Sequence, residues 1–256
     1  MSKFHDVQTF IELSRHVQTP AALHDLMQAV SREMGFDHFA LVHHVDLRPQ
    51  GTLVSHVVTE DFIALSDYPQ AWMDQYINDD IVSDDPVLLA AQRTGAGFGW
   101  DRLGDYIQIT PAHRQLIEKT RKAGICDGFT VPANIPGELN GSCNFAVGPR
   151  HDAPRDNYAM AHVVGSFAFE AARTLVARMR NIADQKPVKL AHRELECIAL
   201  VARGKSDWEI GRILGLSEGT VATYVKRARE RYGVSSRIQV VLRAAYDGTI
   251  PFSELF

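Results

Sequence analysis

The sequence has 256 residues, 45% apolar and 23% charged, a composition typical of a globular chain with one large domain or two modest ones. No apolar run approaches the ~20 residues of a membrane span, and the charged N-terminus lacks the apolar centre of a signal peptide, so we expect a cytoplasmic protein with no membrane partner. The net charge of −4 hides an asymmetry, because residues 184–256 carry twelve Lys and Arg against nine Asp and Glu, which favours a nucleic-acid-binding module beside an acidic body.

The first third of the chain predicts helices, then two strands, then two more helices. Apolar residues recur at three- and four-residue steps over residues 3–35, which indicates helix. "FDHFALVHHVDL" (36–47) and "GTLVSHVV" (51–58) are predicted to be strands joined by a turn around Pro49-Gln50-Gly51. Residues 68–95 are predicted to form helix, loop and helix, and Asp85 before Pro86 marks the start of the second helix.

The middle of the chain predicts one helix, a strand pair and a long helix. An amphipathic helix is expected over residues 111–124, between Pro111 and Gly124. "GFTVPANI" and "GSCNFAVG" are predicted strands around the turn Pro136-Gly137-Glu138. A helix with a broad apolar face follows over residues 156–182.

These elements predict an α+β protein of two domains. The N-terminal domain, residues 1–178, is expected to be an α/β/α sandwich with an antiparallel sheet between helical layers. A polar linker that contains Pro187 covers residues 179–189. Residues 190–256 are expected to be an all-α domain without any strand.

Cysteine and histidine spacing gives no metal or cofactor site. The three cysteines are far apart in the sequence and form no C-x-x-C pair, so we expect small buried thiols. The histidines match no ligand pattern, and the adjacent pair His43-His44 would point to opposite faces of one strand. We therefore expect no metal and no cofactor.

The stretch "GLSEG", Gly215 to Gly219, has two incompatible interpretations. It fits G-x-S-x-G, the turn that carries the nucleophile of serine hydrolases, and Ser217 would then be catalytic. That turn must follow a strand, whereas the preceding "SDWEIGRILG" has the apolar spacing of a short helix. No Asp and His pair follows either, since the last histidine in the chain is His192.

The second interpretation is a helix-turn-helix. Ser206 and Glu209 are spaced as a capping box, and Gly215 stands where a left-handed residue ends the first helix. Ser217 would cap the second helix, whose residues Val221 and Val225 face the core. Such a helix fits the major groove of DNA, with base contacts near its start and basic residues near phosphates. The candidate DNA-binding residues are Ser217, Thr220, Thr223, Tyr224, Lys226, Arg227, Arg229 and Arg231.

Residues 190–241 resemble the C-terminal four-helix domain of LuxR-type regulators. The matching segments are E-x-E-x-x-x-L-x-A-x-G-K-S from Glu194, then E-I-x-x-x-L-G-L-S-x-x-T-V, then G-V-S-S-R. The chain departs from the family at Gly211 and Gly219, where alanine is common, and at Ala222 and Tyr224, where lysine and histidine are common. Each glycine is expected to weaken its helix by roughly 1 kcal/mol relative to alanine.

Residues 68–132 resemble the acyl-homoserine-lactone-binding domain of quorum-sensing LuxR-type proteins. The residues that match in order are Tyr68-Pro69, Trp72, Tyr76, Asp85-Pro86, Phe98-x-Trp100, Ala123-Gly124, Gly128 and Pro132. A phosphoacceptor receiver, the alternative sensing domain, would need alternating βαβ units that residues 1–178 lack.

The resemblance implies a ligand with a lactone carbonyl, an amide and an acyl tail. The Trp72 indole N–H suits the lactone carbonyl, the Asp85 carboxylate suits the amide N–H, and the Tyr68 hydroxyl can donate to the acyl carbonyl. Tyr76 would share a helix face with Trp72, and Trp100 would form a wall of the lactone site. Ser142 and Asn144 project to one face of their strand and are further candidates. The aromatic residues could also be plain core, and Asp85 could be only a helix cap.

The expected function is that of a ligand-responsive transcriptional regulator, not an enzyme. The small-molecule autoinducer would bind the N-terminal domain, and a homodimer would bind double-stranded DNA, with RNA polymerase as a further partner. Pairing is expected through the 156–182 helix and the helix near 236–246. The alternative is a DNA-binding regulator that responds to a different small molecule or to none.

Overall fold

The computed structural model describes residues 3–45, 56–59, 62–136, 138–179 and 188–251. The chain divides into two compact units, residues 1–183 and 184–256, which are considered separately below. The turn predicted at residues 49–51, the start of the strand predicted at residue 51, and most of the expected linker, including Pro187, lie outside the described residues.

The first unit is built on one antiparallel sheet. Its six strands follow the order β2-β3-β1-β6-β5-β4, and every neighbouring pair runs antiparallel. The strands are β1 (His38–His43), β2 (His56–Val58), β3 (Ile63–Ser66), β4 (Phe98–Gly99), β5 (Asp127–Ala133) and β6 (Gly141–Val147). The central strand β6 is buried along its whole length, as expected for a sheet covered on both faces.

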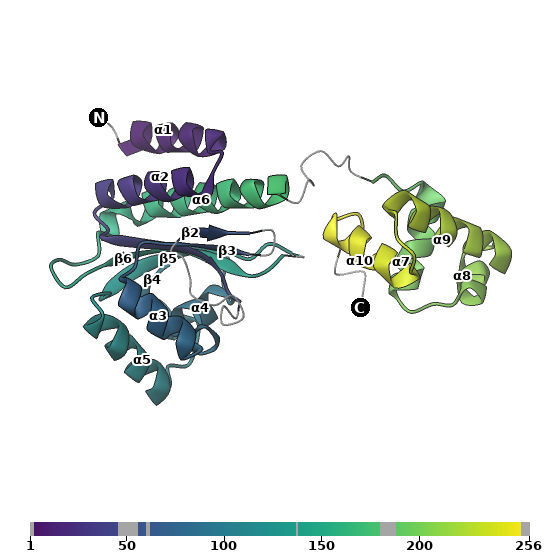
Figure 1. Cartoon of the computed structure of the whole chain (residues 1–256). Coiled ribbons are helices and arrows are strands. Elements are labelled where there is room, and N and C mark those ends of the chain that lie inside the picture. The colour runs from purple at the N-terminus through teal and green to yellow at the C-terminus, as the bar shows by residue number, and fades with distance from the viewer. Residues whose placement is uncertain (1–2, 46–55, 60–61, 137, 180–187, 252–256) are drawn as a thin grey trace. The chain divides into compact units, whose positions relative to one another are not determined.

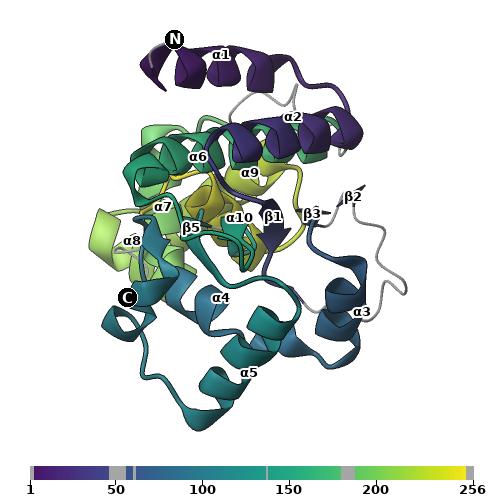
Figure 2. The ribbon, with the colours of Figure 1, turned by 90° about the vertical axis from the view of Figure 1, so that its left-hand side faces the viewer.

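Two layers of helices cover the sheet, which makes the unit an α/β/α sandwich as predicted (Figure 1). On one face lie α2 (Pro20–Glu33) and α6 (Tyr158–Met179), with α1 (Lys3–His16) outside them (Figure 2). Leu23 and Met27 of α2 and Ala168 of α6 are fully buried against Phe39 and Phe145 of the sheet. This continuous core holds the sheet in place for the site on its other face.

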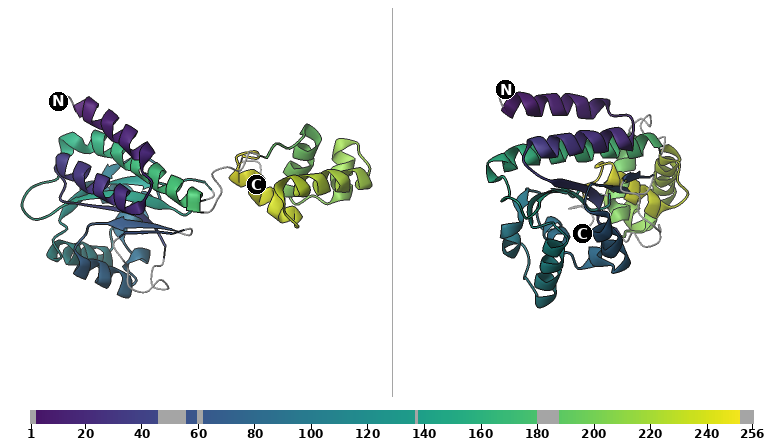
Figure 3. Two further views of the ribbon diagram at one scale, coloured as in Figure 1. Left: turned by 45° about the horizontal axis from the view of Figure 1, so that its top comes forward. Right: turned by 60° about the vertical axis from the view of Figure 1, so that its left-hand side comes forward.

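Shorter helices cover the second face of the sheet. They are α3 (Gln70–Asn78), α4 (Pro86–Ala91) and α5 (Pro111–Lys122), with 3₁₀ turns at η2 (Ile81–Ser83), η3 (Trp100–Asp105) and, before α6, η4 (Arg155–Asn157). Figure 3 shows these helices on the side of the sheet opposite α2 and α6. None of the twelve residues of α5 is buried, although Leu116 and Ile117 face inward. The space under α5 is therefore not filled by its own side chains.

The strand pairing differs from the prediction in the first half of the sheet. Residues 36–47 and 51–58 were expected to pair with each other, but β1 pairs with β3 and β6, and β2 pairs only with β3. The sequence reading missed β3, whose four residues are all buried and show no alternation, and β4, which has only two residues. Because β3 occupies the edge of β1, with Ala40 opposite Ser66, no place remains for β2 there.

The second unit consists of four helices in its described residues, as predicted. They are α7 (His192–Ala202), α8 (Asp207–Leu214), α9 (Glu218–Tyr232) and α10 (Arg237–Tyr246). Cys197, Ile198, Ile210, Val221 and Val240 are fully buried and bring all four helices into one core. Across the described parts of both units, no helix is long and apolar enough to cross a membrane.

Candidate functional sites

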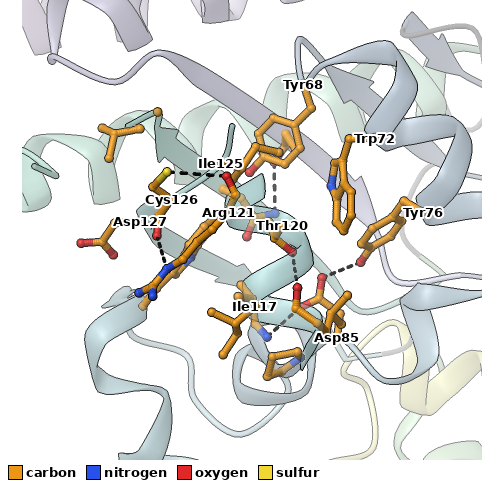
Figure 4. A pocket seen from close by; sticks show the side chains of 18 of the residues that line it. Tyr68, Trp72, Tyr76, Asp85, Ile117, Thr120, Arg121, Ile125, Cys126 and Asp127 are labelled. Atoms are coloured by element: carbon orange, nitrogen blue, oxygen red, sulfur yellow. Dashed lines mark hydrogen bonds between the residues drawn. The ribbon is translucent and has the colours of Figure 1, made fainter. Parts of the chain in front are cut away.

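A cavity of about 720 Å³ lies between the second face of the sheet and helices α3, α4 and α5. Its size falls within the range of small-ligand sites. Six of the seven residues predicted to bind ligand line it: Tyr68, Trp72, Tyr76, Asp85, Trp100 and Asn144. Figure 4 shows the three aromatic side chains of Tyr68, Trp72 and Tyr76 in a row, with Asp85 beside Tyr76. The structure thus brings together residues that are 76 positions apart in the sequence.

Tyr68 and Trp72 present hydrogen-bond donors to this cavity. Tyr68 lies before the helix rather than on it, since α3 begins at Gln70 after the cap residue Pro69. Among the described residues, neither the Tyr68 hydroxyl nor the Trp72 indole N–H has a hydrogen-bond partner. Burial, and then the Asp85 carboxylate, raise the pKa of Tyr68 well above its usual value, so its hydroxyl stays protonated. The cavity therefore holds two donors without acceptors.

Asp85 caps a helix and also lines the cavity. Its Oδ1 accepts the backbone N–H of Val87 at 2.8 Å, which fixes the start of α4. Its Oδ2 accepts the hydroxyl hydrogen of Tyr76 at 2.6 Å. Burial raises the pKa of Asp85, and the hydrogen bonds from Tyr76 and Val87 oppose that rise. Part of its surface stays accessible, as expected for a wall of the cavity.

A chain of hydrogen bonds crosses the cavity face of the sheet. The Trp100 indole N–H donates to Thr130 Oγ1 at 2.8 Å, and Thr130 donates to Asn144 Oδ1 at 2.8 Å. Asn144 Nδ2 donates to Ser142 Oγ at 3.0 Å, and His44 Nε2 lies 2.9 Å from the same hydroxyl. Trp100 and Asn144 thus use their polar groups within the sheet, and Ser142 is fully buried beneath the cavity surface. Ser142 is the one predicted ligand-binding residue that does not line the cavity.

Residues 206–220 form the predicted helix-turn-helix. Ser206 and Glu209 make a capping box at the start of α8, and Gly215 ends that helix in the left-handed region with φ +69°. Ser217 Oγ accepts the backbone N–H of Thr220 at 3.1 Å and caps α9. Because Ser217 follows a helix and not a strand, the serine-hydrolase interpretation of G-x-S-x-G is wrong.

Helix α9 separates a buried face from an exposed one. Val221 and Ala228 are fully buried and Val225 is almost so, as their spacing predicted. On the opposite face, Thr223, Lys226 and Arg227 are exposed, while Thr220 and Tyr224 are half-buried at its flank. The helix therefore offers two hydroxyls near its start and two cations further along, which is the order that groove binding needs.

Two family models match this chain, one over each unit. The model described as "Autoinducer binding domain" matches residues 19–174. The model described as "Bacterial regulatory proteins, luxR family" matches residues 188–244. The chain belongs to the LuxR family of transcriptional regulators. As a LuxR-type protein it combines an autoinducer-binding domain with a DNA-binding helix-turn-helix, and it is not an enzyme.

Known LuxR-type proteins are similar along most of the chain. The transcriptional activator LuxR of Aliivibrio fischeri is 26% identical over 204 residues, 76% of this chain and 77% of that protein. The quorum-sensing regulator RhlR of Pseudomonas aeruginosa is 28% identical and covers 86% of both chains. The crystal structure of Escherichia coli SdiA superposes with a TM-score of 0.63 at 20% identity, over 96% of this chain and 98% of SdiA. The SdiA comparison shows the shared fold.

Three of the four cationic residues predicted to bind DNA have partners within the LuxR-type helical unit, and Lys226 pairs with Glu230 at 3.8 Å on the exposed surface of α9. Arg229 donates to the carbonyl oxygen of Ser235 at 2.8 Å, just after α9 ends. The Arg231 Nε lies 2.8 Å from Glu194 Oε2, and the Glu194 side chain is only 2% exposed. A buried carboxylate without such a partner would be costly, so Arg231 stabilises the packing of α9 on α7. Lys226 and Arg227 remain the cations on the outer face.

Sequence reasoning missed most of the cavity wall outside the motif. The missed residues include Leu116, Ile117, Thr120 and Arg121 on α5, and Ile125 and Cys126 between α5 and β5. The spacing of Leu116, Ile117 and Thr120 on one helix face was the available signal. Charged residues also line the cavity, among them Asp101, Arg121, Asp127, Arg150, His151 and Asp152.

Proposed function

We propose that this LuxR-type regulator binds an N-acyl-homoserine lactone in the cavity and binds DNA as a homodimer through α9. Residues 1–178 would be the ligand-binding and dimerisation domain, 179–189 the linker, and 190–256 the DNA-binding domain. The end of α6 at Met179 and the start of α7 at His192 support these boundaries. We expect a bacterial regulator that binds chromosomal DNA to work in the cytoplasm.

The observation that carries the ligand proposal is the set of polar groups around Trp72. The Trp72 N–H and the Tyr68 hydroxyl face the cavity without acceptors, and the Asp85 carboxylate is an acceptor beside them. An acyl-homoserine lactone offers two carbonyl oxygens and one amide N–H, which match two donors and one acceptor. Trp72 would bind the lactone carbonyl, Tyr68 the acyl carbonyl and Asp85 the amide N–H. Trp100 would contact the ring by its face.

The test is purification with and without a series of lactones that differ in acyl length. Ligand binding to the folded state stabilises it by mass action, so a cognate lactone at 100 times its Kd should add about 2.7 kcal/mol. Soluble yield and melting temperature should both rise. Trp72→Phe and Asp85→Asn should reduce this response, and a chain unaffected by every lactone would refute the lactone proposal.

A second candidate is a LuxR-type regulator that responds to another small molecule or to none. A solved structure of SdiA, which shares this fold, is in complex with octanoyl-rac-glycerol, a molecule with hydroxyl groups and no lactone. The charged residues in the lining of the cavity, such as Arg121 and Asp127, favour a ligand with an additional polar group. Mass spectrometry of small molecules extracted from protein made in its native host would separate the candidates.

Pairing of two chains is proposed through α6 and α10. Ile238, Leu242 and Tyr246 follow one another at four-residue steps on α10, and each side chain is half or more exposed. An exposed apolar stripe of this kind is a common feature of helix pairing surfaces. Leu242→Glu should therefore reduce dimerisation in sedimentation experiments and weaken binding to a two-half-site operator. Arg243→Gln on the same helix lowers the net charge by the same one unit and serves as the charge-matched control.

DNA contacts are proposed for the exposed face of α9. Ser217, Thr220, Thr223 and Tyr224 lie near its start and would contact bases or the nearby backbone. Lys226 and Arg227 would bind phosphates, and Arg229 and Arg231 would contribute less because of their internal partners. Arg227→Ala should lower affinity for all sequences and reduce the salt slope by about 1. Contact with RNA polymerase is part of the proposal for a regulator bound at a promoter.

A further inference from the structure

Tyr76 differs from its two aromatic neighbours in where its hydroxyl hydrogen goes. A tyrosine hydroxyl carries one hydrogen, and Tyr76 gives it to Asp85 Oδ2 at 2.6 Å. Tyr68 and Trp72 keep their donors free of partners among the described residues. Figure 4 shows the Tyr76 hydroxyl turned toward Asp85, away from Tyr68. Tyr76 therefore has no hydrogen left to donate to a ligand while this bond is in place.

The backbone and Tyr76 together fix the Asp85 carboxylate from two sides. Asp85 is the cap residue of α4, with Pro86 next in the chain, so its backbone position is set by the helix start. The Val87 N–H binds Oδ1 at 2.8 Å, and the Tyr76 hydroxyl binds Oδ2. With both oxygens held, the plane of the carboxylate is fixed and the remaining lone pairs are available on the cavity side.

The groups around Asp85 leave Tyr76 as its main side-chain partner. Burial raises the pKa of Asp85, and the hydrogen bond from Tyr76 is the first effect that opposes it, followed by the N–H groups of Val87 and Leu88 on α4. His113 on α5 also lowers this pKa by its charge. Burial, with Asp85 next to it, raises the pKa of Tyr76 well above its usual value, so the hydroxyl remains a donor.

We propose that Tyr76 is a positioning residue, which orients the Asp85 carboxylate to accept an N–H from the ligand and does not itself bind the ligand's polar groups. This inference rests on the proposed binding of an amide ligand at Asp85. It changes the role of Tyr76 from a ligand contact to a support of Asp85. The T-shaped contact of its ring with Trp72, at 5.9 Å between centroids, would in addition hold the indole in place.

The experiment compares Tyr76→Phe with Tyr68→Phe in the full chain. Each variant removes one hydroxyl and keeps the ring, so the two are matched in size. Protonation of Asp85 is followed in the ligand-free protein by the carboxyl ¹³C resonance as a function of pH. Tyr76→Phe should move the Asp85 midpoint to higher pH, because a hydrogen bond to the charged form is lost, and Tyr68→Phe should leave it near the wild-type midpoint.

Binding of N-octanoyl-homoserine lactone is then measured by calorimetry between pH 5 and 8. Tyr76→Phe should bind about tenfold more weakly, as expected for the loss of one hydrogen bond to a charged group, and its pH profile should follow the shifted Asp85 midpoint. Tyr68→Phe should lower affinity without a shift of the profile. An unchanged midpoint and affinity in Tyr76→Phe would overturn the inference.

Two further outcomes are separable. If no lactone binds the wild-type protein, the proposed function fails, while the ligand-free midpoint still tests the support of Asp85 by Tyr76. If Tyr76→Phe does not fold, 3-fluorotyrosine incorporated at position 76 replaces it, because fluorine makes the hydroxyl a stronger donor. The Asp85 midpoint should then move to lower pH, and a midpoint equal to that of the wild type would refute the positioning role.

Discussion

Two glycines in the helix-turn-helix should respond in opposite ways to replacement by alanine. Gly219 lies in the first turn of α9, is exposed, and a Cβ built on it meets no atom within 4 Å. Gly211 lies in α8, is buried, and a Cβ there would stand 2.7 Å from the carbonyl oxygen of Leu216. The sequence suggested only that both glycines weaken their helices, so the structure separates two positions that look alike.

Gly219→Ala should stabilise the C-terminal unit by about 0.5–1 kcal/mol, since alanine loses less backbone entropy in a helix. For a unit of this size the change corresponds to a rise of about 4 °C in its melting temperature. Gly211→Ala brings the same gain in helix propensity, but the Cβ requires the turn at Leu216 to move. We expect the displacement to cost about 1–3 kcal/mol, as overpacking does elsewhere, and the melting temperature to fall.

Differential scanning calorimetry of the full chain without DNA measures both changes in the transition of the C-terminal unit. The change in the free energy of unfolding in the double variant should equal the sum of the two single changes only if the turn adjusts independently of α9. An equal gain from both alanines would mean that the close approach at Gly211 has no energetic weight. A lower melting temperature in Gly219→Ala would contradict the open space around this position.

Three further predictions concern buried or reactive groups. Burial, and then the charge of His43, lower the pKa of His44 to about 4. Because the unfolded chain binds this proton near pH 6.5, the free energy of unfolding should fall by up to about 3 kcal/mol as pH falls from 6.5 to 4. In denaturant titrations, His44→Gln should lack this part of the pH dependence. Glu194→Ala removes a carboxylate that pairs with the half-exposed Arg231 and caps α7 through the backbone N–H of Ala191. Denaturant unfolding should show a loss of about 1–2 kcal/mol in the C-terminal unit, and an unaffected unit would contradict the assigned role. Cys126 is half-buried in the cavity wall whereas the other two cysteines are buried; maleimide should modify it first, as read by mass spectrometry, and a bound lactone should slow the reaction, so equal rates with and without a stabilising lactone would place the ligand elsewhere.

Features set by short stretches of sequence were predictable. Ser206, Gly215 and Ser217 act within three or four residues of themselves, so their capping roles follow from local chemistry alone. The order of helices and strands in the first unit also follows from local sequence patterns, and that order predicts a sandwich architecture. The family motif around Trp72 and Asp85 located the cavity, because its spacing matches a known pattern of residues.

Features that depend on distant partners were not predictable. The place of β3 between β1 and β2 depends on which edges pair in space, and its four residues, Ile63 to Ser66, are all buried and show no alternation. Asn144 was predicted as a ligand contact because the face of its strand could be predicted. Its hydrogen bond from Thr130 on the neighbouring strand could not be predicted. Arg231 was predicted as a phosphate contact because it lies on a basic helix. Its ion pair with Glu194, 37 residues earlier in the chain, has no signal in the local sequence. Charge and alternation identify a face of an element, and the contacts across that face are decided by the tertiary fold.

Helix α5 would link the lifetime of the regulator to the occupancy of its cavity. No residue of α5 is fully buried, and Leu116 and Ile117 are only partly buried against the clusters beneath them. A ligand in the cavity would add contacts to Leu116, Ile117 and Thr120. Copies made before the signal arrives should open along α5 more often and be degraded sooner by cellular proteases. The number of regulator molecules would then follow the signal concentration, so that the amount of folded protein, rather than a change in its shape, would set how much of the regulator can act.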